Sequence, residues 1–223
     1  EKISIRVKGT EENLDALKTG DIKAVIDLTG KTAGEYAPIF FKQAKYTLLD
    51  QNTFWLCEKP DSVGMVGWDA ALTRIATWVK LQDKKTGQIL MVVNTHFDHI
   101  GTEARRNSAL LIIEKIKEIV GTSPAILTGD FNVSEDWDAY KTITNNEFIL
   151  KDAHKVAGKR TGVDFTYHNF GKIPAEKCEK IDFIFVTPQI RVISSYIPFS
   201  QLNDTLFLSD HNPEIVELEI EKS

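Results

Sequence analysis

The chain has 223 residues, of which 42% are hydrophobic, and a formal net charge of −5. This length and composition suffice for one compact domain with a buried core. No apolar stretch reaches the ~18 residues of a membrane-spanning helix, and no charged-then-apolar signal peptide opens the given sequence. The negative charge disfavours a general electrostatic attraction to nucleic acid, although Lys159 and Arg160 could still line a local basic groove.

Short apolar and β-branched runs predict strands along most of the chain, interrupted by one long helical pattern. The helix is expected over residues 103–120, where Ile112, Ile113 and Ile116 recur at helical spacing and Gly121 ends the pattern. A second, short helix is expected over 136–142. The predicted strands lie near residues 3–8, 22–28, 38–48, 53–57, 75–82, 88–95, 125–129, 182–187, 190–196 and 214–220.

Polar side chains with metal-binding or acid–base chemistry stand at the ends of several predicted strands. Asp130 follows the run at 125–127, His96 follows the run at 89–93, and Asp182 opens the strand at 183–186. Each cluster alone is also typical of a turn, because Asp and Asn hydrogen-bond their own backbone. Several such clusters at strand ends in one chain instead indicate a site that holds a hard divalent cation and supplies a general base, as phosphoester hydrolysis requires.

The ordered motifs of the chain resemble those of the endonuclease/exonuclease/phosphatase superfamily, whose fold is that of deoxyribonuclease I. The resemblance extends from about Gly34 to Glu219, with Gly-Glu-Tyr at 34–36, NTHFDH at 94–99, GDFN at 129–132, KIDFIF at 180–185 and SDHNP at 209–213. It implies an α+β fold in which two packed β-sheets are flanked by helices as a four-layer sandwich. It also implies a divalent metal cofactor, Mg²⁺ or Mn²⁺.

The first 33 residues depart from that family pattern. No Asn closes the first predicted strand, and Asp27 is the only acidic residue where the family places a metal-binding Glu. The sequences VKGTEENLDAL and DIKAVIDLTGKTAGEY resemble the repeat of YbbR-like domains, which are extracytoplasmic modules. We therefore expect residues 1–33 to form an atypical β-α-β segment, with the first strands and helix of the family truncated or replaced. Residues 34–223 would form the catalytic domain, and the resemblance suggests an extracytoplasmic location.

The family resemblance assigns catalytic roles to residues at the matching positions. His211 would be the general base that activates water, oriented by its neighbour Asp210. Asp130 would position the water, and Asn132 would hydrogen-bond a phosphate oxygen. The remaining catalytic assignments are His96, which would contact the phosphate, Glu35, which would fix the tautomer of His96, and Asp182, which would orient catalytic or metal-bound groups.

The metal ligands implied by the resemblance are Asp210, Asn132 and Asp27. For Asp27 the alternative is a solvated residue beside the turn at 28–30. Further residues in or near the motifs are possible substrate contacts; they are Asn94, His99, Arg105, Tyr167 and His168. For His99 and Arg105 a solvated helix-entry loop is an equally good explanation. Trp137, in the loop after GDFN, is a candidate for stacking on substrate, whereas His154 is expected at the surface.

These features predict a metal-dependent hydrolase that cleaves a phosphodiester or a phosphomonoester by attack of activated water. One alternative is a nuclease acting on DNA or RNA, which a clustered basic groove would favour. A second alternative is a catalytically impaired phosphatase-like or interaction module, because the amino terminus lacks the usual metal carboxylate. We expect a monomer with a phosphoester substrate; the family motifs do not specify the leaving group.

Overall fold

The computed structural model describes residues 22–25, 36–145, 150–199, 201–203 and 206–220. The predicted strand at 3–8, most of the atypical segment 1–33 and the residues Asp27 and Glu35 lie outside this part of the chain. The proposed domain division after residue 33 therefore stays a prediction.

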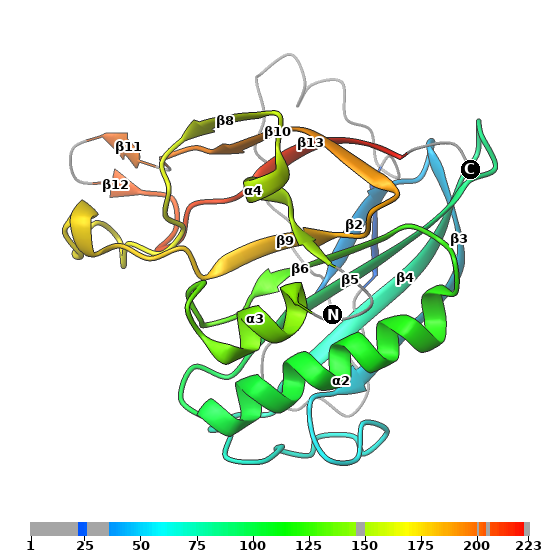
Figure 1. Cartoon of the computed structure of the whole chain (residues 1–223), viewed down its shortest axis with the longest axis horizontal. Coiled ribbons are helices and arrows are strands. Elements are labelled where there is room, and N and C mark those ends of the chain that lie inside the picture. Colours follow the sequence, from blue (N-terminus) through cyan, green and yellow to red (C-terminus); the bar gives the residue numbers. More distant parts are fainter. Residues whose placement is uncertain (1–21, 26–35, 146–149, 200, 204–205, 221–223) are drawn as a thin grey trace.

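A six-stranded mixed sheet forms the centre of the molecule (Figure 1). Its strands, in spatial order, are β3 (Tyr46–Trp55), β4 (Ile75–Asp83), β5 (Ile89–His96), β6 (Ala125–Asp130), β9 (Asp182–Val186) and β7 (Lys151–Asp152). Neighbouring strands are antiparallel except β5 and β6, which run parallel. A parallel pair needs a long crossover connection, and helix α2 (Thr102–Val120) provides it.

Smaller sheets supply the second strand layer. Strand β10 (Ile190–Ile197) pairs with β13 (Ile215–Ile220) and with β8 (Lys159–Gly162), and β1 (Ile22–Val25) pairs with β2 (Ile39–Lys42). The hairpin of β11 (Gln201–Asn203) and β12 (Leu206–Phe207) projects beyond them (Figure 1). The short helices are α3 (Asp138–Thr144), α4 (Ala153–Val156) and a 3-10 turn, Ala175–Lys177.

The central sheet is buried on both faces. One face packs against α2 and α3, with Phe97, Phe131 and Phe183 meeting Ile112 in a single cluster of buried side chains. The other face packs against β10 and β13 through a separate cluster of aliphatic residues that includes Val186. This confirms the predicted α+β class with two packed β-sheets and flanking helices. No helix in the described residues is long and apolar enough to cross a membrane.

Some strands and helices begin or end at residues other than those predicted from the sequence. The prediction of a single strand over residues 38–48 was wrong. The chain turns at 43–45, where the Lys45 N–H donates to the Lys42 carbonyl at 3.1 Å, and this turn separates β2 from β3. Strand β3 then continues through the polar residues 50–52, which pair with β4 although they are exposed. The long helix is confirmed, whereas α3 begins two residues later than predicted.

Candidate active site

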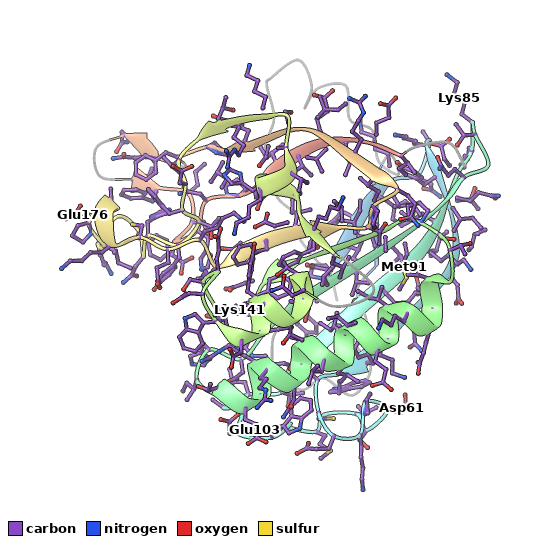
Figure 2. The ribbon with its side chains drawn as sticks, viewed as in Figure 1. Asp61, Lys85, Met91, Glu103, Lys141 and Glu176 are labelled. Atoms are coloured by element: carbon purple, nitrogen blue, oxygen red, sulfur yellow. The ribbon has the colours of Figure 1, made fainter. Side chains whose placement is uncertain are left out.

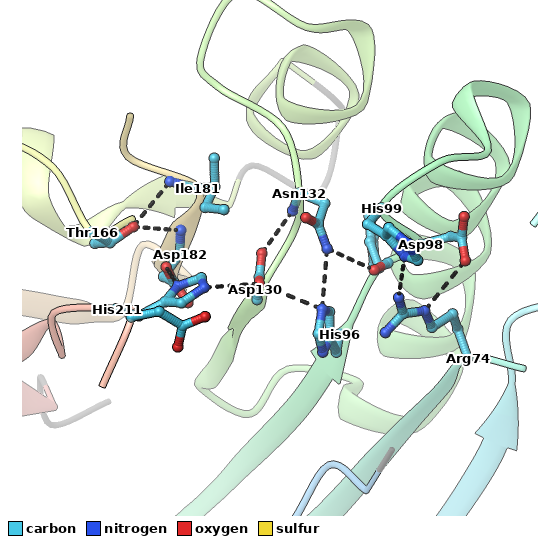
Figure 3. A network of polar contacts seen from close by, with 12 residues as sticks. Arg74, His96, Asp98, His99, Asp130, Asn132, Thr166, Ile181, Asp182 and His211 are labelled. Carbon is cyan, nitrogen blue, oxygen red and sulfur yellow. Dashed lines mark hydrogen bonds and ion pairs between the residues drawn. The ribbon is translucent and has the colours of Figure 1, made fainter. Parts of the chain in front are cut away.

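Three site residues lie side by side because of the strand register. His96 on β5 is opposite Asp130 on β6, and Asp130 is opposite Asp182 on β9. Residues that lie directly opposite each other in a sheet have neighbouring side chains on one face. The three motifs are therefore brought together by strand pairing, as Figure 3 shows.

His211 joins this row from the segment between β12 and β13. Its Nδ1 lies 2.8 Å from Oδ2 of Asp182, and its Nε2 lies 3.9 Å from Oδ2 of Asp130. Asp182 is therefore the carboxylate that contacts the imidazole, and the roles predicted for Asp182 and Asp210 stay predictions. The carboxylate of Asp210 instead accepts a hydrogen bond from Ser209 Oγ at 3.3 Å.

Asn132 holds the other side of the site through a left-handed backbone conformation, with φ of 49°. Its backbone N–H donates to Asp130 Oδ1 at 2.8 Å. Its Nδ2 donates to the Phe97 carbonyl and lies 3.0 Å from His96 Nε2. Since His96 Nε2 also lies 3.4 Å from Asp130 Oδ2, the imidazole, the amide and the carboxylate form one polar network.

The charges in this cluster are closely coupled. Burial, followed by the nearby charge of Asp182, raises the pKa of Asp130 to about 7. Burial alone would lower the pKa of His211, but its hydrogen bond to Asp182 and the charges of Asp182 and Asp130 together raise it. The site therefore holds protons more tightly than separate carboxylates and imidazoles do in water.

Asp130, Asp182 and His211 offer ligand atoms that all lie within 4.8 Å of one another. Two carboxylates at this separation repel each other, and a divalent cation between them would remove the repulsion that raises the pKa of Asp130. Carboxylate oxygens are also the ligands that Mg²⁺ prefers, so the residues fit such an ion.

This group differs from the predicted metal ligands. Asp210 is not a member of the group within 4.8 Å. Asn132 lies beside it, with its backbone N–H 2.8 Å from Asp130 Oδ1. Their assignment as ligands stays a prediction. Asp27 lies outside the described residues, as does Glu35, which was expected to fix the tautomer of His96.

An open cavity of about 420 Å³ lies beside the row of His96, Asp130 and Asp182. Its lining includes His96, Asp130, Asp182 and Asn94. Asn94 thus borders the cavity as a substrate contact would, although its Nδ2 also donates to the Pro38 carbonyl at 3.0 Å.

The other predicted substrate contacts lie in different surroundings. Tyr167 packs its ring against His211, with the ring centroids 4.9 Å apart. His168, by contrast, is 1% exposed and surrounded by phenyl rings, so its assignment to a substrate-facing loop was wrong. His154 is buried rather than at the surface, because its Nδ1 lies 2.8 Å from Ser195 Oγ.

A buried ion pair lies beside the site, and its Asp98 belongs to the NTHFDH motif, although no role was predicted for it. Arg74 Nε lies 3.4 Å from Asp98 Oδ2, and an Arg74 Nη lies 3.1 Å from His99 Nδ1. Burial opposes ionisation of Asp98, but backbone N–H groups, first those of Gly101 and Ile100, hold its pKa well below the usual range. His99, which was predicted as a substrate contact, is thus held by Arg74 next to the site.

A second buried ion pair joins the segment that carries Asp182 to the segment that carries His211. Lys180 Nζ lies 2.9 Å from Glu214 Oε2 and donates to the Asp182 carbonyl at 3.0 Å. Lys180 precedes Asp182 by two residues, and Glu214 follows His211 by three. The pair therefore ties the strand that bears Asp182 to the segment that bears His211.

Thr166 was also missed by sequence reasoning. It is fully buried, and its Oγ1 accepts the backbone N–H groups of Ile181 and Asp182, each at 3.0 Å (Figure 3). These bonds fix the start of β9, where Asp182 stands. A single threonine in a loop has no periodicity or motif that would have identified it.

The fold and this site define a member of the endonuclease/exonuclease/phosphatase class. A model of the endonuclease/exonuclease/phosphatase family matches residues 23–211. The chain belongs to this family.

Two solved structures from Bacteroides are similar to the chain. An endonuclease/exonuclease/phosphatase from Bacteroides vulgatus is 62% identical, with a TM-score of 0.86 over 90% of this chain and 77% of that one. A mannosyl-6-phosphatase from Bacteroides thetaiotaomicron is 34% identical, with a TM-score of 0.82 over 90% of this chain and 78% of that one.

A curated relative comes from a virus. An uncharacterised protein of Acanthamoeba polyphaga mimivirus is 30% identical over 175 residues, which make up 74% of this chain. The matched region spans 63% of the length of that relative.

Proposed function

We propose that the protein is a divalent-metal-dependent phosphoesterase that hydrolyses a phosphomonoester by attack of an activated water. The observation that carries this proposal is the contact of His211 Nδ1 with Asp182, which leaves His211 Nε2 directed toward Asp130. An imidazole oriented by one carboxylate and open at its other nitrogen is the usual form of a general base. The 34% identity to a mannosyl-6-phosphatase supports a monoester rather than a nucleic acid as substrate.

In the proposed reaction, His211 Nε2 takes a proton from the water while Nδ1 keeps its hydrogen bond to Asp182. Asp130 positions that water from the neighbouring strand. His96 and Asn132, on the opposite side of Asp130, hydrogen-bond the phosphate oxygens on which charge develops. Asp130 and Asp182 would hold Mg²⁺ or Mn²⁺, which when bound neutralises the phosphoryl and leaving oxygens.

Hydrolysis of two chromogenic esters tests the proposal. p-Nitrophenyl phosphate is a monoester and bis-p-nitrophenyl phosphate a diester, and each is assayed with Mg²⁺, with Mn²⁺ and after exhaustive chelation. We expect metal-dependent cleavage of the monoester that is lost with the chelator. Unchanged turnover after chelation would contradict the metal mechanism, and cleavage of the diester alone would favour a nuclease or phosphodiesterase. Inactivity with both metals would instead favour the non-catalytic module.

A further inference from the structure

A second cavity, of about 270 Å³, lies between the start of α2 and the segment that follows GDFN. Figure 2 shows the region from the side, with Glu103 on α2 and Lys141 on the neighbouring α3. The side chains around this cavity come from both elements; they are Thr102, Arg105, Arg106, Val133, Asp136, Trp137, Asp138 and Ala139. The volume is below the ~300 Å³ at which pockets for drug-sized ligands begin, so it suits a single ring.

Arg105 and Trp137 form the most ordered part of this cavity. The guanidinium of Arg105 lies 5.0 Å from the ring centre of Trp137, within the range of a cation–π contact. Arg105 is 4% exposed, and its two terminal nitrogens donate to the Asp98 carbonyl and to Thr102 Oγ1. Its buried Nε has no hydrogen-bond partner among the residues that the structure describes. The guanidinium is therefore fixed in place and still has donor capacity.

Trp137 remains 40% exposed although its ring is held by Arg105. Indole is the side chain with the largest flat apolar face, and fixing it in advance lowers the entropy that a ligand must overcome. The sequence predicted stacking by Trp137 from its position alone, and its contact with a buried cation supplies the physical reason.

The charges around the cavity are balanced rather than cationic. Arg105 and Arg106 face Asp136 and Asp138 across the same space. A polyanion such as a nucleic acid strand would be repelled by the two carboxylates. A neutral ring that carries hydroxyl groups would instead donate to the carboxylates and accept from the guanidiniums, while its C–H face covers the indole.

The cavity and the site residues share the chain segments 97–98 and 132–133. Asn132 donates to the carbonyl of Phe97, and Arg105 donates to the carbonyl of Asp98, the next residue. Val133, which lines the cavity, follows Asn132 in sequence. The wall of the cavity thus begins at the residue that follows Asn132 in the chain.

We infer that this cavity binds the sugar ring of a sugar phosphate whose phosphate lies at His96 and Asn132. The inference rests on the proposed function, since it names the part of the substrate that carries the phosphate. Trp137 supplies the stacking surface, and Arg105 holds the indole and offers its remaining donors to ring hydroxyls. Trp137 would then determine specificity between ring-bearing and short-chain monoesters.

A binding experiment tests this inference without requiring catalysis. Saturation-transfer NMR is recorded on the full chain with a methyl hexopyranoside and, separately, with a nucleoside as probe. We expect transfer to the hexoside that is lost in Trp137→Leu and retained in Tyr196→Leu, a control that removes an equally exposed aromatic ring from β10. Transfer to the nucleoside alone, transfer that survives Trp137→Leu, or no transfer to either probe would overturn the inference.

Steady-state kinetics supply the second readout. In Trp137→Leu the KM for a hexose 6-phosphate should rise about tenfold, which corresponds to ~1.4 kcal/mol, with kcat unchanged. The KM for glycerol 3-phosphate, which has no ring, should stay the same, and Trp137→Phe should recover most of the loss. An equal change for both substrates would mean a purely structural role and would overturn the inference. If the wild-type protein hydrolyses neither ester, the proposed function fails, whereas the NMR result still decides whether the ring binds.

Discussion

Removing the positive charge of Lys180 should destabilise the protein strongly. The side chains of Lys180 and Glu214 are only 6% and 2% exposed, so Lys180→Met would leave a buried carboxylate without its cation. Breaking one partner of a buried ion pair typically costs about 3–5 kcal/mol. For a domain of this size each kcal/mol lowers the melting temperature by roughly 2–4 °C, so we expect a fall of about 6–20 °C.

Urea unfolding of matched variants measures this cost. The control is Arg191→Met, which breaks an ion pair with Glu219 at the exposed surface and should cost less than ~1 kcal/mol. The double variant Lys180→Met/Glu214→Leu should recover most of the loss, because it removes both charges and leaves none unpaired.

The pH dependence gives an internal check. Burial already raises the pKa of Glu214 above its ordinary value despite Lys180, and loss of Lys180 should raise it further. A carboxyl whose folded-state pKa is raised contributes stability at low pH that is lost as the pH rises through that pKa. The cost of Lys180→Met should therefore shrink as the pH falls. If Lys180→Met costs no more than Arg191→Met at neutral pH, the two segments do not depend on this ion pair and the reasoning is wrong.

Three further predictions concern the site and its support. His211→Ala should lower turnover about a hundredfold or more with little change in melting temperature, and retained turnover would exclude it as the base. The apparent affinity for Mg²⁺, measured by calorimetry, should fall as the pH drops below about 7, because the raised pKa of Asp130 makes protons compete with the ion; a flat profile would remove Asp130 from the metal site. Asp69→Ala should lower the melting temperature, because Asp69 accepts the N–H of Ala104 at 2.6 Å and caps α2, which begins after a glycine; an unchanged melting temperature would refute this cap.

The sequence predicted the strands that carry the site, because their apolar runs and the polar residues that follow them are local features. It also placed His96, Asp130 and His211 at strand or loop ends that converge in the structure. Their partners depend on pairing between distant segments. The register of β6 and β9 places Asp182 beside Asp130, and His211 reaches Asp182 from 29 residues further along the chain, which no local pattern encodes.

Burial of polar residues was the other property that the sequence did not reveal. His154, His168 and Arg105 are all less than 9% exposed, although histidine and arginine are seldom fully buried in proteins. Each is buried because residues distant in sequence surround it, such as Ser195 beside His154 and Trp137 beside Arg105. Such environments arise only from tertiary packing.

The alignment of His96, Asp130 and Asp182 across three strands has a consequence for refolding. Helix α2 forms from contiguous residues, but the catalytic row needs β5, β6 and β9 in register, and His211 then closes it from a segment 29 residues beyond Asp182. Long-range pairings of this kind form slowly, because each loop must close before its contacts are made. Recovery of turnover should therefore lag behind recovery of helical circular dichroism, which makes enzyme activity the stricter measure of native strand order in this chain.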